Sequence, residues 1–496
     1  MKEQSYFPSL DQFKELSVNY NVIPVTGEIL ADTDTPVSAF MKIDDGSEAF
    51  LLESVEGGEK WGRYSLLGTR PKAIIRSKNG KVETVENGRS TVIDGDPLEV
   101  LKSYLAKYQI AELEGLPRFT GGAIGYMGYD VVRHIEVLPD TLKKELDLYD
   151  FCFLITDTLL VFDNVNHKIQ IIANIYIDDN ADLERLYQDG IKKIEDLKVK
   201  LKNNLAISVS NQEQTNEKSE VTSNFTKEEF KAVVGKVKEY IKSGDVIQTV
   251  ISQRFEKKFN GNPLDIYRAL RLINPSPYMF FMRLGGVELA GSSPEILVRV
   301  EGEEVSVRPI AGTRPRGRDE SEDEALEVEL LGDPKERAEH IMLVDLGRND
   351  IGKVAETGSV VVDEFMIVER YSHVMHIVSN VVGKKLKDSD SFDVFRACFP
   401  AGTLSGAPKI RAMEIIEELE PCKREIYGGA VGSIGFSGTL DLCITIRTVV
   451  IKDDRVYVQA GAGIVADSDP ESEFEETKNK AKGVLKAVEM ASDGLS

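Results

Sequence analysis

The sequence lacks long hydrophobic runs. No segment approaches the roughly 18 uninterrupted apolar residues that indicate a transmembrane helix. Residues 1–10 also lack the basic start and following apolar run of a secretory signal. We therefore expect no signal peptide, no membrane contact and a cytoplasmic location.

Cysteine and positive charge are also scarce. The 496 residues include only 4 cysteines, with no Cys-x-x-Cys spacing, which predicts reduced and mostly buried thiols. The 61 basic residues against 83 acidic ones give a formal charge of -22, which argues against nucleic acid as a partner. The length exceeds that of a usual single core, so we expect two portions or one unusually large interlaced unit.

The first two hundred residues read mainly as strands joined by tight turns. Asn79-Gly80 and Asn87-Gly88 are hairpin signals between alternating segments, and residues 151–162 followed by 168–175 predict another hairpin. Apolar residues at helical spacing then predict a helix over 181–202.

A polar segment divides the chain. Residues 203–223 have almost no apolar periodicity, which predicts a flexible linker between an N-terminal portion, 1–202, and a C-terminal portion, 224–496. Thr226 with Glu229 forms a predicted capping box for the next helix. Further strand signals are a hairpin at Gly285-Gly286 and segments near 246–255, 297–300, 431–436, 442–451 and 456–460. Strands and helices do not alternate regularly, so the expected class is α+β.

A helix is predicted from Asp333, the N-cap, through Pro334 at its first position, with Glu336 as the reciprocal acid of a capping box. Glu339 lies three residues after Glu336 and shares its face. Apolar residues at 341–344 and 346 predict that this helix is largely buried.

The end of the chain repeats this pattern. Asp469-Pro470 opens another helix with Glu473 and Glu476 three residues apart and Lys480 one turn later. Acids in a first helical turn usually only complement the helix dipole. If the two acidic pairs converge, however, they would need a hard cation such as Mg²⁺.

Several stretches of the C-terminal portion are unusually dense in Gly, Pro and polar residues. They are 291–295, 308–315, 399–409 and 459–463. Together with the 333–350 helix, these ordered motifs closely resemble the chorismate-utilising enzymes from about residue 225 to the C-terminus. The resemblance implies a large interlaced fold of mostly antiparallel sheets flanked by helices, with an N-terminal regulatory portion.

Within that family the chain resembles the members that convert chorismate and ammonia to anthranilate and pyruvate in tryptophan biosynthesis. Gln248 lies where the water-adding members have a lysine base, and Ala311 lies where aminodeoxychorismate synthases carry a lysine. Ammonia itself is then the expected nucleophile. The alternatives left open are an aminodeoxychorismate synthase and a non-catalytic tryptophan-sensing relative.

The resemblance also implies roles for individual residues. The expected Mg²⁺ ligands and their neighbours are Glu336, Glu339, Glu473 and Glu476. The expected catalytic residues are Glu295, His376 and Thr403. The expected substrate-binding residues are Gly312, Thr313, Tyr427, Arg447, Gly461, Gly463 and Lys480. Without the resemblance, a Gly-x-Gly is usually a turn, a lone strand arginine a surface ion pair, and a histidine in an apolar run a core residue.

Two separate segments resemble the tryptophan feedback site of the family. The residues expected there are Glu53, Ser54, Asn274, Pro275, Pro277, Tyr278 and Met279. They could form an apolar slot with polar groups for an amino acid, or they could be strand ends that pack between portions. The chain has no Gly-x-Cys-x-Gly nucleophile turn, so we expect a separate glutamine amidotransferase subunit as a partner, in a heterotetramer.

Overall fold

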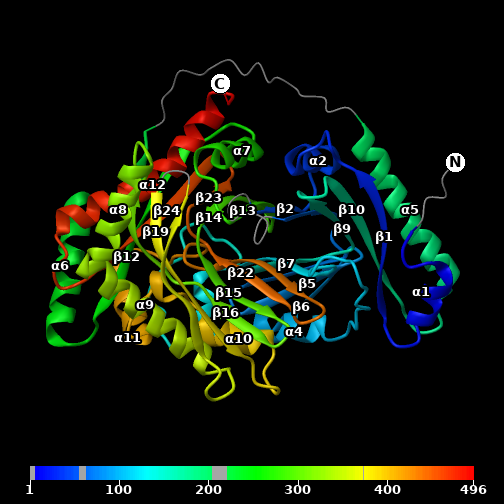
Figure 1. Ribbon diagram of the computed structural model, residues 1–496, viewed down its shortest axis with the longest axis horizontal. Coiled ribbons are helices and arrows are strands. Elements are labelled where there is room, and N and C mark those ends of the chain that lie inside the picture. The colour runs from blue at the N-terminus through cyan, green and yellow to red at the C-terminus, as the bar shows by residue number, and fades with distance from the viewer. Residues whose placement is uncertain (1–5, 55–62, 204–219, 372–373, 496) are drawn as a thin grey trace.

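The computed structural model describes residues 6–54, 63–203, 220–371 and 374–495. Two twelve-stranded sheets pack face to face, and helices cover their outer faces (Figure 1). Every strand pairing in these sheets is antiparallel, from the β1 with β10 pair through the β7 with β8 pair. The expected α+β class of mostly antiparallel sheets flanked by helices is confirmed. Within the described ranges, no helix is long and apolar enough to cross a membrane.

The first sheet draws on both ends of the chain. Its strands, in spatial order, are β1 (Val22–Leu30), β10 (Lys168–Tyr176), β9 (Thr158–Asp163), β3 (Tyr64–Thr69), β2 (Ala49–Glu53), β13 (Tyr278–Leu284), β14 (Val287–Ser293), β23 (Thr448–Lys452), β24 (Arg455–Ile464), β12 (Gln248–Lys258) and β11 (Thr222–Ser223), with β20 (Gly406–Ala407) paired to β12.

The second sheet is built in the same way. Its strands, in spatial order, are β17 (Ile310–Pro315), β19 (Val374–Lys384), β16 (Glu304–Val307), β15 (Ile296–Glu301), β22 (Leu440–Ile444), β21 (Ala430–Gly435), β7 (Gly122–Met127), β8 (Phe151–Ile155), β4 (Ala73–Lys78), β5 (Lys81–Glu86) and β6 (Arg89–Asp94), with β18 (Val361–Arg370) paired to β19.

The helices form the two outer layers. They are α1 (Leu10–Leu16), α2 (Pro36–Ile43), α4 (Pro97–Leu105), α5 (Leu183–Lys202), α6 (Lys227–Ser243), α7 (Pro263–Ile273), α8 (Glu320–Gly332), α9 (Pro334–Gly352), α10 (Ser391–Cys398), α11 (Lys409–Leu419) and α12 (Pro470–Ser492), with short 3₁₀ turns η1 (Tyr129–His134) and η2 (Gly402–Leu404). Apolar side chains of both sheets, such as Phe50, Phe280 and Tyr126, fill the layer between them.

The two portions of the chain are interlaced through both sheets. In the first sheet β2 pairs with β13, so that Glu53 lies opposite Met279. In the second sheet β7 pairs with β21 along their whole length. Each sheet therefore combines strands of the N-terminal portion with strands of the C-terminal portion, which confirms the interlaced architecture.

The hairpins predicted from the Asn-Gly turns are confirmed, but two segments predicted as single strands are each divided between the two sheets. Asn79 and Asn87 both have positive φ and close the hairpins β4–β5 and β5–β6, as expected. Residues 151–162 split at 156–157, because β8 lies in the second sheet and β9 in the first. Residues 442–451 split in the same way between β22 and β23. The strands in each segment are apolar because each is buried in its own sheet, and polar residues lie where the chain crosses: Thr156-Asp157 in the first segment and Arg447 in the second.

The predicted start of α9 is correct, but its details differ. Asp333 is the N-cap and accepts hydrogen bonds from the backbone of Lys335 and Glu336. The Glu336 carboxylate does not complete a capping box; it accepts from Arg314 Nη1 at 3.3 Å instead. Ile341 is 42% exposed, so only one face of α9 is buried. By contrast, the capping box of Thr226 and Glu229 is present as predicted.

Part of the predicted linker, residues 204–219, lies outside the described residues. Thr222–Ser223, near its end, already pairs with β12 as strand β11. All four cysteines are free and buried, as their spacing predicted; they are Cys152, Cys398, Cys422 and Cys443.

Candidate active site

The two acidic helix starts converge. Glu339 on α9 is half-buried, and burial raises the pKa of its carboxyl group. The negative charges of Glu336 and of Glu476, which lies on α12, raise this pKa further. Burial likewise raises the pKa of Glu473, with a further contribution from Glu476. Segments about 140 residues apart thus bring like charges into one region, which is costly without a compensating cation.

Three of these four acids already have partners on the chain. Glu336 accepts a hydrogen bond from Arg314, and Glu476 forms an ion pair with Lys480 at 2.7 Å. The Glu473 carboxylate has a hydrogen bond with Ser468. Among the described residues no partner is found for the Glu339 carboxylate. The donors are all carboxylate oxygens, the chemistry that Mg²⁺ prefers. In the described part of the chain they do not form a preassembled cluster of three or more metal-binding side chains.

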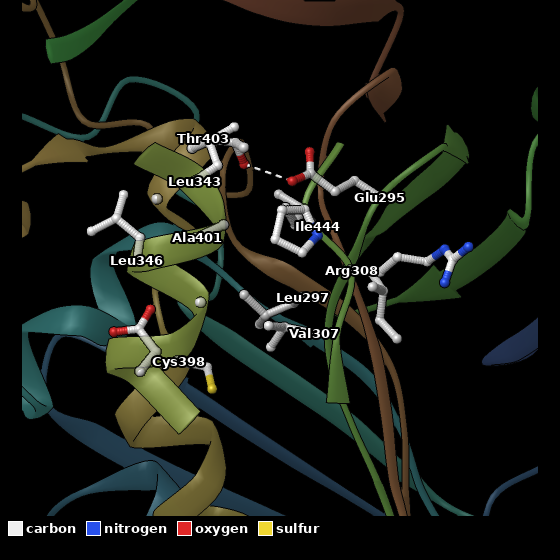
Figure 2. A pocket seen from close by; sticks show the side chains of 15 residues that line it. Glu295, Leu297, Val307, Arg308, Leu343, Leu346, Cys398, Ala401, Thr403 and Ile444 are labelled. Carbon is white, nitrogen blue, oxygen red and sulfur yellow. Dashed lines mark hydrogen bonds between the residues drawn. The ribbon is translucent and has the colours of Figure 1, made fainter. Parts of the chain in front are cut away.

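Glu295 lies between β14 and β15, and its environment favours the protonated form. The side chain is buried, and this burial raises its pKa to about 8, against the opposing effects of a hydrogen bond from Thr403 and the charge of Lys480. Thr403 Oγ1 donates to Glu295 Oε1 at 3.0 Å. Figure 2 shows this contact, with Leu343 and Leu346 of α9 nearby, beside a cavity of about 40 Å³.

His376 on β19 faces a bulge in the neighbouring strand β17. The register shifts between Ala311 and Thr313, and Gly312 there has φ +69°. His376 Nδ1 lies 2.9 Å from the Gly312 carbonyl oxygen and 3.1 Å from Thr313 Oγ1. Burial lowers the pKa of His376, which favours the neutral imidazole. A Cβ atom on Gly312 would lie 3.2 Å from Glu336 Oε2, so this bulge also adjoins the acidic cluster.

Arg447 lies at the point where the chain passes from β22 in one sheet to β23 in the other. Its backbone has φ +50°, and its carbonyl accepts from Ser292 N at 3.1 Å. Burial lowers the pKa of its guanidinium, while Tyr427 and Glu476 raise it. In the described part of the chain we find no hydrogen bond or ion pair of the guanidinium. A half-buried cation in this state is suited to receive an anion.

The Gly461 to Gly463 stretch of β24 completes the arrangement. A Cβ on Gly461 would lie 2.9 Å from the Tyr427 hydroxyl, and one on Gly463 would lie 2.4 Å from Gln248 Nε2. Lys480 Nζ donates to the Gly461 carbonyl at 3.0 Å. Glycine is therefore required here because side chains approach the backbone closely. All the predicted catalytic, substrate-binding and metal-binding residues lie in one region, linked through these contacts and charges.

His340 differs from its neighbours. It is fully buried, and its Nε2 lies 2.6 Å from Ser379 Oγ. Burial lowers its pKa to about 4. These contacts favour the packing role that its place in the sequence suggested.

The segments expected to bind tryptophan meet at a second, separate cavity of about 140 Å³ between the sheets. Its lining includes Glu53, Ser54, Pro277, Tyr278 and Met279. Two other expected residues lie apart from it: Asn274 ends α7 and donates to Ser292 Oγ at 3.0 Å, and Pro275 does not line the cavity.

The polar groups of this cavity are arranged differently from the expectation. The buried Glu53 carboxylate accepts from Tyr267 and lies 3.4 Å from Arg271 Nη2, both on α7. The sequence analysis missed Arg299 and Asp441, which form an ion pair at 2.9 Å within the lining. These two are 142 residues apart, and no sequence spacing connects them.

Comparisons with known proteins agree with this geometry. Residues 48–486 match the family described as chorismate binding enzyme. The chain is 51% identical to the anthranilate synthase component 1 of Acetivibrio thermocellus, over 98% of this chain and 99% of that protein. It is also 51% identical to that of Aquifex aeolicus, over 98% of each.

A crystal structure of anthranilate synthase component I from Streptococcus pneumoniae TIGR4 superposes with a TM-score of 0.76 at 38% identity, covering 92% of this chain and 98% of that one. The chain therefore belongs to the chorismate binding enzymes, within the anthranilate synthase component 1 group.

Proposed function

We propose that this chain converts chorismate and ammonia to anthranilate, pyruvate and water. The observation that carries the proposal is the buried Glu295 carboxyl group, whose pKa of about 8 keeps it protonated near neutral pH. A protonated carboxylic acid in a closed site can donate its proton to a departing hydroxyl group. The raised pKa and the hydrogen bond from Thr403 support the role of general acid for this carboxyl group.

Chorismate carries two carboxylates, and the site offers cations and donors for both. Arg447, with Tyr427 beside it, would bind the enolpyruvyl carboxylate through its free guanidinium. The ring carboxylate would lie against the backbone amides of Gly461 and Gly463, near Lys480. This orientation would direct the ring hydroxyl toward Glu295.

The acidic cluster would hold Mg²⁺ through Glu339 and Glu476, with Glu336 and Glu473 beside them. When bound, Mg²⁺ would act as a Lewis acid that neutralises the ring carboxylate next to these acids. The unpaired Glu339 carboxylate and its raised pKa support this assignment, because a cation would relieve the repulsion around it.

The residues then serve two steps. Ammonia forms the new C–N bond at the ring carbon next to the carboxylated one, while the ring hydroxyl leaves as water with the proton from Glu295, which Thr403 orients. Loss of a ring proton, with His376 in reach as a neutral base, then expels the enolpyruvyl group as pyruvate. The ring becomes aromatic, so this step is effectively irreversible.

Two residues support ammonia as the nucleophile. Gln248, next to Gly463, cannot act as the base that would activate water. Ala311, on β17, has no amine that could attack the ring. Both features argue against the isochorismate-forming and aminodeoxychorismate-forming reactions.

The ammonia would come from a separate glutamine amidotransferase subunit, in a heterotetramer. Tryptophan would bind the cavity between the two sheets, which residues of β2 and β13 help to line, and lower the affinity for chorismate, a coupling that must be reciprocal. The cytoplasmic location expected from the sequence stays a prediction.

The test uses the purified chain with chorismate, Mg²⁺ and ammonium, and follows anthranilate by its fluorescence and pyruvate by an enzyme-coupled assay. We expect both products in equal amounts, with tryptophan suppressing both. An amino-chorismate without pyruvate would instead favour an aminodeoxychorismate synthase. Absence of any turnover in folded protein would favour a non-catalytic tryptophan sensor.

A further inference from the structure

A fully buried ion pair lies behind the candidate active site, outside all the motifs discussed above. Glu420 follows α11, and Arg424 comes four residues later in the chain; each side chain is 1% exposed. Arg424 Nη2 donates to Glu420 Oε1 at 2.6 Å, and its Nε donates to the same carboxylate. Burying such a pair costs more than it returns unless further hydrogen bonds satisfy both groups. The other hydrogen-bond partners of Glu420 and Arg424 therefore indicate the role of the ion pair.

The guanidinium uses its remaining donors on two separate backbone segments. Arg424 Nη1 donates to the Leu404 carbonyl at 2.6 Å, and Nη2 donates to the Val250 carbonyl at 2.8 Å. Its planar group also lies over two aromatic rings, 4.8 Å from the centroid of Tyr129 and 5.7 Å from that of Tyr427.

Glu420 anchors this arrangement from the other side. Its Oε1 also accepts from the Ser252 backbone amide and hydroxyl, both at 2.8 Å. The pair is thus joined to β12 at two points, Val250 and Ser252. A fork of this kind fixes the relative position of the segments it joins.

Each segment carries part of the proposed chemistry. Leu404 follows Thr403, which donates to Glu295. Val250 lies opposite Gly463 in the β12–β24 ladder. Tyr427 is the proposed contact to the enolpyruvyl carboxylate. One guanidinium therefore contacts the turn at Leu404, the strand at Val250 and the ring of Tyr427, all of which adjoin the proposed substrate site.

We propose that Arg424, held by Glu420, is a positioning residue that aligns Thr403 and Tyr427 for the reaction without touching the substrate. The proposal rests on the proposed function. Lysine cannot replace the arginine, because a single ammonium cannot reach Glu420, Leu404 and Val250 with the geometry of a planar fork.

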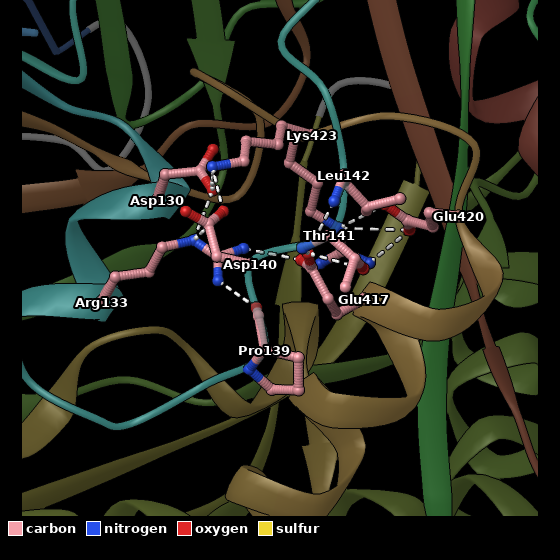
Figure 3. A network of polar contacts seen from close by, with 10 residues as sticks. Asp130, Arg133, Pro139, Asp140, Thr141, Leu142, Glu417, Glu420 and Lys423 are labelled. Atoms are coloured by element: carbon pink, nitrogen blue, oxygen red, sulfur yellow. Dashed lines mark hydrogen bonds and ion pairs between the residues drawn. The ribbon is translucent and has the colours of Figure 1, made fainter. Parts of the chain in front are cut away.

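The chain offers a matched control in the network of Figure 3. Arg133 is also largely buried and forms an ion pair with Glu417 at 2.6 Å and with Asp130 at 3.1 Å. Glu417 in turn accepts from the Thr141 amide at 2.7 Å. This pair holds a loop of the N-terminal portion. Among the described residues, no hydrogen bond or ion pair joins it to the proposed site residues, so Arg133→Lys tests the general cost of changing a buried arginine.

The experiment compares Arg424→Lys with Arg133→Lys in the ammonia-dependent assay, at a temperature where circular dichroism shows both variants folded. We expect kcat to fall about 100-fold and the KM for chorismate to rise in Arg424→Lys, as misplacement of catalytic groups predicts. Arg133→Lys should stay within about threefold of the unchanged chain. Equal losses in the two variants would overturn the proposal.

A double-mutant cycle separates positioning from general damage. If Arg424 acts partly through Thr403, Arg424→Lys will cost at least about fivefold less in a Thr403→Val background than in the unchanged chain. Full additivity would overturn the proposal. If Arg424→Lys does not fold, Glu420→Gln is used in the same cycle, since it keeps the shape of the acceptor.

The pH profile gives a third readout. Burial raises the pKa of Glu295, whereas among the described residues Thr403 and Lys480 lower it by favouring the charged form. Weakening the Thr403 contact should therefore move the alkaline limb of kcat/KM to higher pH in Arg424→Lys and not in Arg133→Lys. No anthranilate from the unchanged chain would refute the proposed function, whereas a normal unchanged chain with a normal Arg424→Lys variant would refute only this inference.

Discussion

At the scale of single residues, the surroundings of a carboxyl group decide its chemistry. Glu295 and Glu336 are the same residue type near one site. Glu295 is buried, and the hydrogen bond from the neutral Thr403 hydroxyl does not offset this burial, so its pKa rises to about 8. Glu336 instead accepts from the Arg314 guanidinium. The first can donate a proton near neutral pH, whereas the second forms an ion pair with Arg314.

Replacing the acid tests this difference. We expect Glu295→Gln to lower kcat by about 10²- to 10⁴-fold, the usual contribution of a general acid, with little change in the KM for chorismate. Steady-state kinetics with saturating ammonium measures both constants. Glu301→Gln, on the next strand, is the control and should behave like the unchanged chain. A Glu295→Gln variant with normal kcat would exclude Glu295 as the acid.

The same group makes a prediction about stability. Its pKa in the folded protein, about 8, lies above its usual value of 4.5, so the folded state holds the proton more tightly than the unfolded chain does. Its contribution to the free energy of unfolding is then complete below about pH 4.5 and is lost as the pH rises through about 8.

Glu295→Gln should abolish this part of the pH dependence and raise the thermal midpoint near pH 8 relative to the unchanged chain. Differential scanning calorimetry between pH 5 and 9 measures the effect. Parallel curves for the two proteins would contradict the raised pKa.

At the scale of elements, helices α9 and α12 bring their acidic starts to one place. Each helix is locally ordinary: Asp333 and Asp469 cap it, and proline follows in the first turn. Capping explains the acids within each helix. It does not explain why the charge of Glu476 raises the pKa of Glu339. Only the packing of α12 on β24, and of α9 on β17 and β19, produces that encounter.

We expect Glu339→Gln to weaken Mg²⁺ binding at least about 10-fold, since even indirect support of a metal site is usually worth that much. Calorimetric titration of Mg²⁺ with chorismate present and ammonium absent measures this affinity. Without metal, the Glu339→Gln variant should also have a higher melting temperature than the unchanged chain, because the substitution removes like-charge repulsion. Glu475→Gln, whose carboxylate pairs with Lys478 on α12, should change neither quantity.

At the scale of the whole molecule, the two portions are not independent. Both sheets continue from one portion into the other, at the β2–β13 and β7–β21 pairs. Separating the portions would expose one edge of each of these four strands and the apolar layer between the sheets.

A protease site inserted within residues 204–219 tests this interlacing. After cleavage we expect the two fragments to elute together in size-exclusion chromatography and to keep most of the activity. Residues 224–496 expressed alone should be insoluble or aggregated. A soluble, monomeric and active C-terminal fragment would contradict the conclusion that the two portions depend on each other through the shared sheets.

The sequence by itself determined what depends on neighbouring residues. Helix caps, the turns at Asn79-Gly80 and Asn87-Gly88, and buried cysteines follow from local chemistry, and the ordered motifs identified the family. Local pattern could not show that residues 151–162 and 442–451 each cross between sheets, because a strand buried in either sheet is apolar in the same way.

The tertiary structure alone decided which distant groups meet. It brought Glu53 against Tyr267 and Arg271 of α7, and it placed the Glu420–Arg424 pair against Leu404 and Val250. Charges and protonation depend on burial and on partners that lie 100 or more residues away, as for Thr403 and Glu295. No periodicity in the chain encodes such long-range contacts, because they arise only when the two sheets close on each other.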